Sequence, residues 1–296
     1  MIQSAQFSVL SRTGGSTPND DRANGACGPE AGHAWVIDGA TGVVQNTFIP
    51  GAESDAAWIA ARLSQYFEGL PISAAPVRVP MRRILGRIRD DYLLAISGRD
   101  VPDYALPSAA GLFCGWERCA RKIILRMTGL GDCSALLRAA DGTTHIIGDL
   151  TPGGGDADKL LQFDAFRGAK DEASQQALWS FIKEQRSKMN RPGGYWVFSI
   201  APEAASYLRE QTFVLKPPVD ILMMTDGFAR LVDHFDWYTP ETLIAAAEAR
   251  GLDALYDELR GLEAAEPDCR AVPRVKKEDD ASAVFIRIVD DESRVW

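Results

Sequence analysis

The sequence lacks several features that would place the protein in well-known classes. Its 296 residues contain five cysteines, an odd number with no Cys-x-x-Cys pair, and three dispersed histidines. A disulfide scaffold or a zinc site built from Cys and His is therefore not indicated. No apolar run reaches the roughly 18 residues of a membrane-spanning helix, and the first residues alternate like a strand instead of forming a signal core. We expect a soluble, cytoplasmic protein.

Positive charge is scarce as well. The net charge is −9 at pH 7 and the pI is near 5.0, which argues against the basic footprint of a nucleic-acid-binding protein. A local group of four arginines within residues 82–89 is interpreted as the solvated face of a helix. The Gly-x-Ser-x-Gly elbow of serine hydrolases is absent, so that class is not indicated. We expect neither a nucleic-acid nor a membrane partner, and we expect a monomer.

What the sequence does contain is a set of apolar segments that meet acidic residues. Residues 35–42 begin as a run of large β-formers that stops at Asp38. Residues 220–228 repeat the pattern around Asp226, and Asp279 stands just before the last alternating segment. A carboxylate at the end of a buried strand must be hydrated, paired or bound to a metal. An Asp-Gly pair taken alone is usually a turn, but three such strand ends predict a site.

The chemistry of these side chains favours magnesium or manganese over zinc, because carboxylates are hard oxygen ligands. Without a cation, converging carboxylates would repel one another and raise the pKa of at least one of them. Two divalent ions bridged by one carboxylate would remove that repulsion and activate a water for attack on phosphorus. Asp38 is the predicted bridge.

The spacing of apolar residues predicts mixed secondary structure in one domain covering residues 1–296. Helical spacing is found at 56–67, 81–92, 177–182, from Thr239-Pro240 onward and at 252–259. Strand patterns occupy 2–10, 35–38, 108–116, 121–129, 132–140, 143–148, 195–199, 212–215, 221–225 and 281–288, with an Asp-Gly hairpin turn at 141–142. We expect residues 108–149 to form one antiparallel meander and residues 150–194 to be an excursion from the sheet. Segregated helices and antiparallel strands predict an α+β layered sandwich.

One short polar segment, Asn19-Asp20-Asp21-Arg22, is expected to be extended and to pair near residues 35–38. That pairing would bring Asp20 toward Asp38. Because side chains alternate along a strand, Asp20 and Arg22 would then share a face.

The order of these motifs resembles the metal-dependent type 2C protein serine/threonine phosphatases over essentially the whole chain. The family elements are an Asn-Glu-Asp segment, Asp-Gly-x-Gly, Gly-Asp-Ser, Ser-Asp-Gly and a final Asp-Asn-x-Thr. The matching residues here are Asn19-Asp20-Asp21, Asp38-Gly39, Gly131-Asp132, Asp226-Gly227 and Asp279-Asp280. The resemblance implies a four-layer α-β-β-α sandwich with two mainly antiparallel sheets, in which the excursion at about 150–194 corresponds to the flap subdomain.

The resemblance also implies roles for individual residues around a centre of two Mn²⁺ or Mg²⁺ ions. Asp38 would bridge the ions, and the Gly39 carbonyl would be a further ligand. Asp226 and Asp279 would complete the first ion. Asp20 would hold a metal-bound water, and Asp132 would help to bind a third, weaker ion.

Three positions depart from the family pattern. Asp20 is one methylene shorter than the usual Glu. Ala40 stands where eukaryotic members carry a His that is thought to protonate the leaving group, which would favour activated esters. Ser16 aligns with the phosphate-gripping Arg, so a strong charge-assisted contact is missing. Arg22 is the predicted replacement, with Arg12 as a second candidate; the alternative is that Arg22 is a surface residue paired with a neighbour.

The predicted function is hydrolysis of phosphoserine or phosphothreonine in a phosphorylated protein by a metal-activated water, without a covalent intermediate. Two alternatives remain open at this point. One is a pseudophosphatase that binds a phosphoprotein or another partner but turns over poorly. The other is a small-molecule phosphatase.

Overall fold

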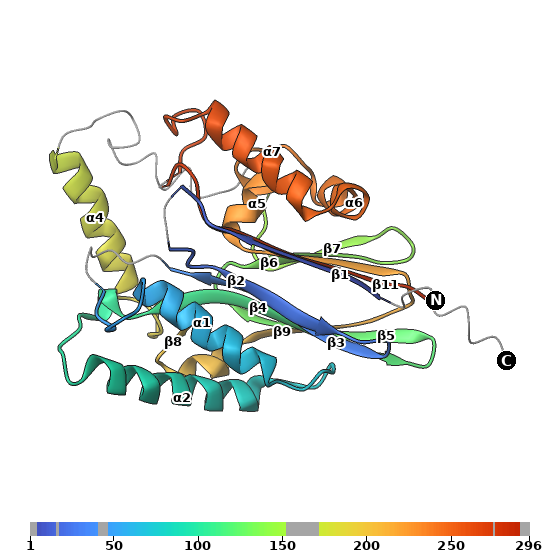
Figure 1. Cartoon of the computed structure of the whole chain (residues 1–296), viewed down its shortest axis with the longest axis horizontal. Coiled ribbons are helices and arrows are strands. Elements are labelled where there is room, and N and C mark those ends of the chain that lie inside the picture. Colours follow the sequence, from blue (N-terminus) through green and yellow to red (C-terminus); the bar gives the residue numbers. More distant parts are fainter. Residues whose placement is uncertain (1–4, 16–17, 41–46, 152–171, 275, 291–296) are drawn as a thin grey trace.

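Four layers make up the protein in the computed structural model, which describes residues 5–15, 18–40, 47–151, 172–274 and 276–290. Two β-sheets lie face to face, α1 and α2 cover one of them, and α5, α6 and α7 cover the other (Figure 1). The strand pairings within both sheets are antiparallel. The predicted α+β sandwich is therefore confirmed. Within the described residues no helix is long and apolar enough to cross a membrane.

The first sheet has the strand order β1-β11-β10-β6-β7. Its strands are β1 (Ala5–Arg12), β6 (Ser134–Arg138), β7 (Thr144–Ile147), β10 (Val219–Met224) and β11 (Ala281–Ile288). Its outer face is covered by α5 (Asp226–Asp233), α6 (Pro240–Arg250) and α7 (Leu252–Ala265). The predicted start of α6 is confirmed, since Thr239 forms a capping box with Thr242.

The second sheet has the order β2-β3-β4-β5-β9, and β8 pairs with β4 beside this path. Its strands are β2 (Arg22–Cys27), β3 (Ala31–Gly39), β4 (Ser108–Cys119), β5 (Lys122–Leu130), β8 (Phe198–Ser199) and β9 (Arg209–Leu215). It is covered by α1 (Asp55–Glu68) and α2 (Arg78–Ile96), with the short 3₁₀ helices η1 (Asp103–Ala105) and η2 (Pro202–Tyr207) nearby. Ser54 caps α1 by accepting a hydrogen bond from the Ala57 amide.

The expected meander at 108–149 is wrong in one respect that matters for the site. β4 pairs with β5, and β6 pairs with β7, as predicted. The strands β5 and β6, however, belong to different sheets, because the chain crosses from one sheet to the other at residues 131–133. Gly131 has a φ of +80°, and its close approach to Ala110 leaves no room for a side chain. Local hydrophobic patterning cannot distinguish a hairpin from such a crossover, because both connect two strands through a short turn.

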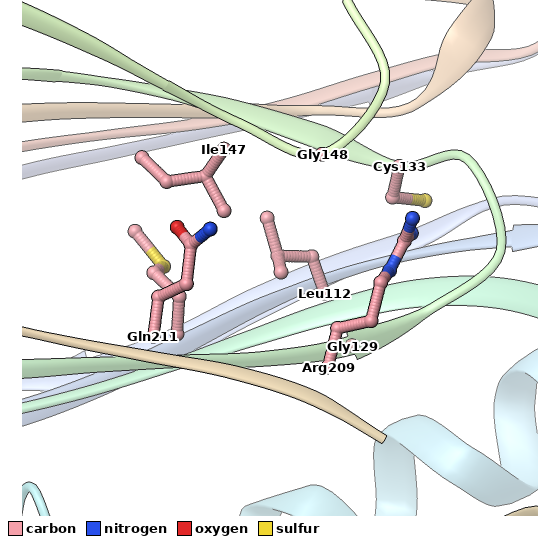
Figure 2. Close-up of a pocket in the computed structure, with 8 residues that line it drawn as sticks. Leu112, Gly129, Cys133, Ile147, Gly148, Arg209 and Gln211 are labelled. Carbon is pink, nitrogen blue, oxygen red and sulfur yellow. The ribbon is translucent and has the colours of Figure 1, made fainter. Parts of the chain in front are cut away.

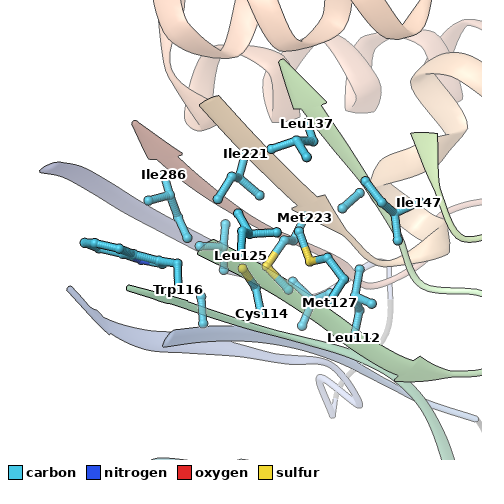
Figure 3. Close-up of a cluster of buried hydrophobic side chains, with 14 of the residues drawn as sticks. Leu112, Cys114, Trp116, Leu125, Met127, Leu137, Ile147, Ile221, Met223 and Ile286 are labelled. Atoms are coloured by element: carbon cyan, nitrogen blue, oxygen red, sulfur yellow. The ribbon is translucent and has the colours of Figure 1, made fainter. Parts of the chain in front are cut away.

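The core between the sheets is formed by the inward-facing residues of both layers, including Trp116, Leu125, Met127, Ile221 and Met223 (Figure 3). All five are at most 1% exposed. Successive side chains of a strand point to opposite sides of the sheet. Once these core residues are known, the face on which each remaining strand residue lies is therefore fixed.

The excursion predicted at 150–194 contains α4 (Glu172–Arg186), which includes the helical stretch expected at 177–182. Residues 152–171 of this region lie outside the described part of the chain. α4 stands beyond one end of the sandwich in Figure 1. The Arg186 guanidinium attaches it by donating to the carbonyl oxygens of Tyr104 at 2.8 Å and Leu106 at 3.2 Å.

At two Asp-Gly pairs, 38–39 and 226–227, the glycine lies very close to the backbone of another segment of the chain. A Cβ on Gly39 would lie 2.5 Å from the Asp20 carbonyl oxygen, and one on Gly227 would lie 1.9 Å from that of Asp280. These glycines are therefore needed to bring separate segments together, and each stands directly after an acidic residue of the predicted site.

Gly227→Ala is expected to destabilise the fold by about 1–3 kcal/mol or more, because the new methyl group meets backbone that cannot move aside cheaply. The matched control is Gly261→Ala in α7, where a Cβ would meet nothing within 4 Å. That substitution should stabilise the protein by up to about 1 kcal/mol through helix propensity. Urea unfolding of both variants measures the difference, and equal midpoints would contradict the close approach.

Candidate metal centre

The end of β3 directs Asp38 into the space between the sheets. Val36 packs in the core between the sheets, whereas Trp35 and Ile37 pack against the helices on the other side. Asp38 shares the face of Val36 because side chains alternate. In the neighbouring strand Arg22 pairs with Ile37, as predicted for this segment.

As predicted, the segment before β2 brings Asp20 next to the end of β3, where the Gly39 amide donates to the Asp20 carbonyl oxygen at 3.2 Å; its side chain, however, points away from the space between the sheets. Ala23 packs against the core between the sheets, so Asp21 shares that face and Asp20 does not. The Asp20 carboxylate instead accepts a hydrogen bond of 2.5 Å from the Ser54 hydroxyl at the start of α1. Asp21 is thus the acidic residue that sequence reasoning missed. The alternation of β2, once its register with β3 is known, is the signal that identifies it.

Thr225, which directly follows β10 of the opposite sheet, contacts Asp21. The Thr225 hydroxyl donates to Oδ2 of Asp21 at 2.8 Å, and it accepts from the Ser282 amide at 3.0 Å. Asp21 is 2% exposed and Thr225 is fully buried. Asp226 follows Thr225 as the first residue of α5, where the positive end of the helix dipole favours a carboxylate.

Electrostatics shows that Asp21, Asp38 and Asp226 share one neighbourhood. The pKa of Asp38 is raised well above its ordinary value, first by burial and then by the charges of Asp226, Asp21 and Asp132. A hydrogen bond with Asp226 raises the pKa of Asp38 further. Burial likewise raises the pKa of Asp21, with Asp226 adding to the shift and the Thr225 hydrogen bond opposing it. Carboxylates from segments adjoining both sheets therefore meet at this end of the sandwich.

Asp132 belongs to the rim of this cluster. It is exposed on the crossover between β5 and β6, and its charge reaches Asp38. The crossover is held by Arg209, whose guanidinium donates to the carbonyl oxygen of Gly131. The unexpected change of sheet at residues 131–133 is what brings this acidic residue to the site.

Asp279 is bound to cations supplied by the chain. Its Oδ1 lies 2.6 Å from Nζ of Lys276, and its Oδ2 lies 2.9 Å from Nη2 of Arg230. Arg230 is itself paired with Glu263 at 2.7 Å, and both side chains are buried. The charge of Lys276 also interacts with Asp38 and Asp226, so Asp279 adjoins the cluster through this lysine.

Asp280 organises the loop at the N-terminal side of the site. Its carboxylate accepts from the amides of Gly14 at 2.8 Å and Asp20 at 2.7 Å. It therefore fixes the backbone that leads into β2, which in turn sets the direction of Asp21.

The two candidate phosphate-binding arginines make other contacts. Nη1 of Arg22 donates to the carbonyl oxygens of Asn19 at 2.8 Å and Asp21 at 2.6 Å. Arg12 pairs with Asp253 at 3.3 Å on the surface. The role of Arg22 as a clamp stays a prediction. Ser16 lies outside the described residues.

The donor set at this end of the sandwich fits a hard divalent cation. It consists of carboxylate oxygens held between the sheets, and their mutual repulsion is the kind that a cation relieves. Across the described ranges no three Asp, Glu, His or Cys side chains already stand close enough to form a complete metal site.

A separate cavity of about 120 Å³ lies between the sheets beside the crossover (Figure 2). It is lined by Leu112, Met127, Gly129, Cys133, Ile147, Gly148, Arg209 and Gln211. None of the acidic residues of the cluster lines it, so this cavity is not the candidate metal centre.

Asp21→Asn should make the metal-free protein less sensitive to pH. The raised pKa of Asp21 means that the folded state binds more protons than the unfolded chain above the ordinary value of 3.8. Stability should therefore fall as pH rises through this window, and the neutral side chain should remove part of that fall. Thermal melts in EDTA between about pH 5 and 8 test this. The exposed Asp257→Asn is the control, and equal slopes for the two variants would count against a repulsive cluster.

No protein-family model and no curated protein matches the sequence. Solved structures do match it over nearly its whole length. The serine/threonine phosphatase PstP/Ppp of Mycobacterium tuberculosis is 12% identical with a TM-score of 0.54, and the alignment covers 97% of this chain and 99% of that one. PppA, a regulatory component of T6SS in Pseudomonas aeruginosa, is 14% identical with a TM-score of 0.53, covering 96% and 97%.

RsbX, solved in complex with magnesium, is 10% identical with a TM-score of 0.52, and the alignment covers 96% of this chain and 95% of that one. Identities this low establish the architecture alone. The resemblance inferred from the motif order is thereby confirmed at the level of the fold: the chain has the fold of the type 2C serine/threonine phosphatases.

Proposed function

We propose that the protein is a cytoplasmic Mn²⁺- or Mg²⁺-dependent phosphatase that hydrolyses phosphoserine and phosphothreonine esters in proteins. The observation that carries this proposal is the meeting of Asp21, Asp38 and Asp226 at one end of a type 2C phosphatase fold. Asp21 precedes β2, Asp38 lies in β3, and Asp226 begins α5 about 190 residues later in the chain. Burial of several repelling carboxylates is costly unless a ligand compensates it.

Each acidic residue is proposed to have its own role at the metal centre. Asp38 would serve both ions, the Gly39 carbonyl would be a further ligand, and Asp226 and Asp279 would ligate the first ion. Asp21 would hold a water at the site, the role predicted for Asp20, because Asp21 has the inward-facing side chain. Asp132 would serve a third, weaker ion from the rim. Bound divalent cations supply charge neutralisation and lower the pKa of a bound water.

Ala40 leaves the leaving group without a neighbouring acid at that position. A good leaving group such as an aryl oxide needs little protonation, so aryl esters are expected to react faster than phosphoserine peptides. Arg22, if it grips phosphate, would do so through guanidinium nitrogens other than the Nη1 that holds Asn19 and Asp21.

One observation favours a pseudophosphatase as the second candidate. Both carboxylate oxygens of Asp279, a proposed ligand of the first ion, already pair with Lys276 and Arg230. A site with weakened metal binding would retain the fold and bind a phosphorylated partner without turning it over. Hydrolysis assays decide between the two candidates.

Asp38→Asn should lower Mn²⁺-dependent hydrolysis of an aryl phosphate by about 100-fold or more, because it removes charge that would hold both ions. The assay uses purified protein with Mn²⁺ or EDTA, and Asp257→Asn on the exposed face of α7 is the control. A phosphothreonine peptide is tested in parallel to separate protein from small-molecule substrates. Activity that persists in EDTA, or that Asp38→Asn leaves unchanged, would overturn the proposal.

Arg22→Ala tests the clamp separately from the metal centre. Loss of a charge-assisted phosphate contact should raise KM several-fold and leave the Mn²⁺ requirement as it is. An unchanged KM and kcat would show that Arg22 only ties together the backbone at Asn19 and Asp21.

Mn²⁺ should also raise the melting temperature, because an ion that binds only the folded state stabilises it by about 2.7 kcal/mol at 100 times its Kd. Asp226→Asn should reduce this rise, since it removes one of the proposed ligands. Differential scanning fluorimetry with increasing Mn²⁺ measures the shift. The same rise in wild type and Asp226→Asn would argue against Asp226 as a ligand.

A further inference from the structure

We infer that the ammonium group of Lys276 is a built-in cation of the acidic cluster and competes with a divalent ion for Asp279. This inference rests on the proposed metal site and deepens it. In this inference, Lys276 compensates negative charge and thereby lowers the affinity of the site for divalent ions or the number of ions that it binds.

The first support is the occupancy of Asp279. Its Oδ1 lies 2.6 Å from Nζ of Lys276 and also accepts the Asp280 amide at 3.0 Å. Its Oδ2 lies 2.9 Å from Nη2 of Arg230. Oδ1 thus has two partners, and a metal ion can bind at this oxygen only by displacing one of them.

The two cations differ in how firmly they are held. Arg230 is buried in α5 and pairs through Nη1 with the fully buried Glu263 at 2.7 Å. Displacing this cation would remove a charged partner from the fully buried Glu263 as well as from Asp279, which is expensive. Lys276 has a side chain that is 40% exposed and stands outside the helices and strands. Lys276 is therefore the partner that an incoming ion can displace.

The second support is the position of Lys276 relative to the other carboxylates. Besides its contact with Asp279, its charge interacts favourably with Asp38 and Asp226. One ammonium group thus attracts carboxylates from β3, from α5 and from the segment before β11. The proposed first ion would be attracted to the same carboxylates. The ammonium group and the divalent ion would therefore compensate the same negative charge.

A consequence for metal binding follows from this competition. An ion that binds at Oδ1 of Asp279 competes with the ammonium group for that oxygen, and the metal-free cluster already has part of its charge compensated. Divalent ions should therefore bind more weakly to the wild-type chain than to a chain without this charge. The side chain of Lys276 sets that difference, since Arg230 remains in place in both.

The experiment compares Lys276→Met with Lys277→Met. Lys277 is the next residue and is exposed, so both substitutions remove one positive charge from the same segment. Mn²⁺ binding is measured by isothermal titration calorimetry, and free Mn²⁺ is counted by electron paramagnetic resonance. Lys276→Met should bind Mn²⁺ about tenfold tighter than wild type, as expected for removing a unit charge a few ångströms from the ion, or should bind one additional ion. Lys277→Met should match wild type.

Stability gives a readout that does not depend on activity. In EDTA, Lys276→Met should melt at a lower temperature than Lys277→Met, because it loses the cation that compensates the cluster, and Mn²⁺ should remove that deficit. Lys276→Arg keeps the charge and should behave like wild type in both measurements. If Lys276→Met does not fold in EDTA, it is purified with Mn²⁺ and its bound ions are counted after dialysis.

Equal Mn²⁺ affinity and stoichiometry in Lys276→Met and Lys277→Met would overturn the inference, as would a failure of both to bind Mn²⁺. Binding that follows the expected order in a protein without phosphatase activity would support the inference and reject the proposed function. The two ideas can therefore fail separately.

Discussion

Repulsion among carboxylates at one end of the sandwich is the constraint around which the site is built. Asp21 directly precedes β2, Asp38 lies in the neighbouring strand β3, and Asp226 begins the helix that follows a strand of the other sheet. The backbone holds them there through interactions that do not involve a metal. Gly39 and Gly227 permit close approach, and Thr225 connects Asp21 to the second sheet. Part of the remaining charge is compensated by buried or half-buried cations.

Those cations distinguish this chain from a purely acidic metal site. Arg230 is fixed by Glu263, so its interaction with Asp279 is part of the packing of α5 against α7. Lys276 is more exposed and belongs to a segment outside regular structure. Of the two cations near Asp279, one is therefore buried within the helical layer and the other is partly exposed to solvent.

The helices on the two outer faces have different roles in placing the site. Ser54, the N-cap of α1, donates a hydrogen bond to the Asp20 carboxylate. This contact fixes the backbone next to Asp21, directly before β2. α5 presents Asp226 at its first residue, and α4 is attached beyond the end of the sandwich by Arg186. The acidic cluster is thus supported by the packing of both layers, and mutations in the supporting residues should affect it through backbone position.

The sequence alone determined the identity of most elements and the order of the motifs. The boundaries of β11 and the capped start of α6 follow from period-two alternation and from Thr239-Pro240, both of which are local signals. Only the tertiary structure decided which acidic side chains meet. At the start of β2 the Asp20 side chain contacts Ser54 of the α1 cap, whereas the Asp21 side chain contacts Thr225. The crossover at residues 131–133 brought Asp132 to the rim, and packing paired Asp279 with Lys276 and Arg230. Register, sheet membership and ion pairing depend on contacts between distant segments, and no local pattern contains them.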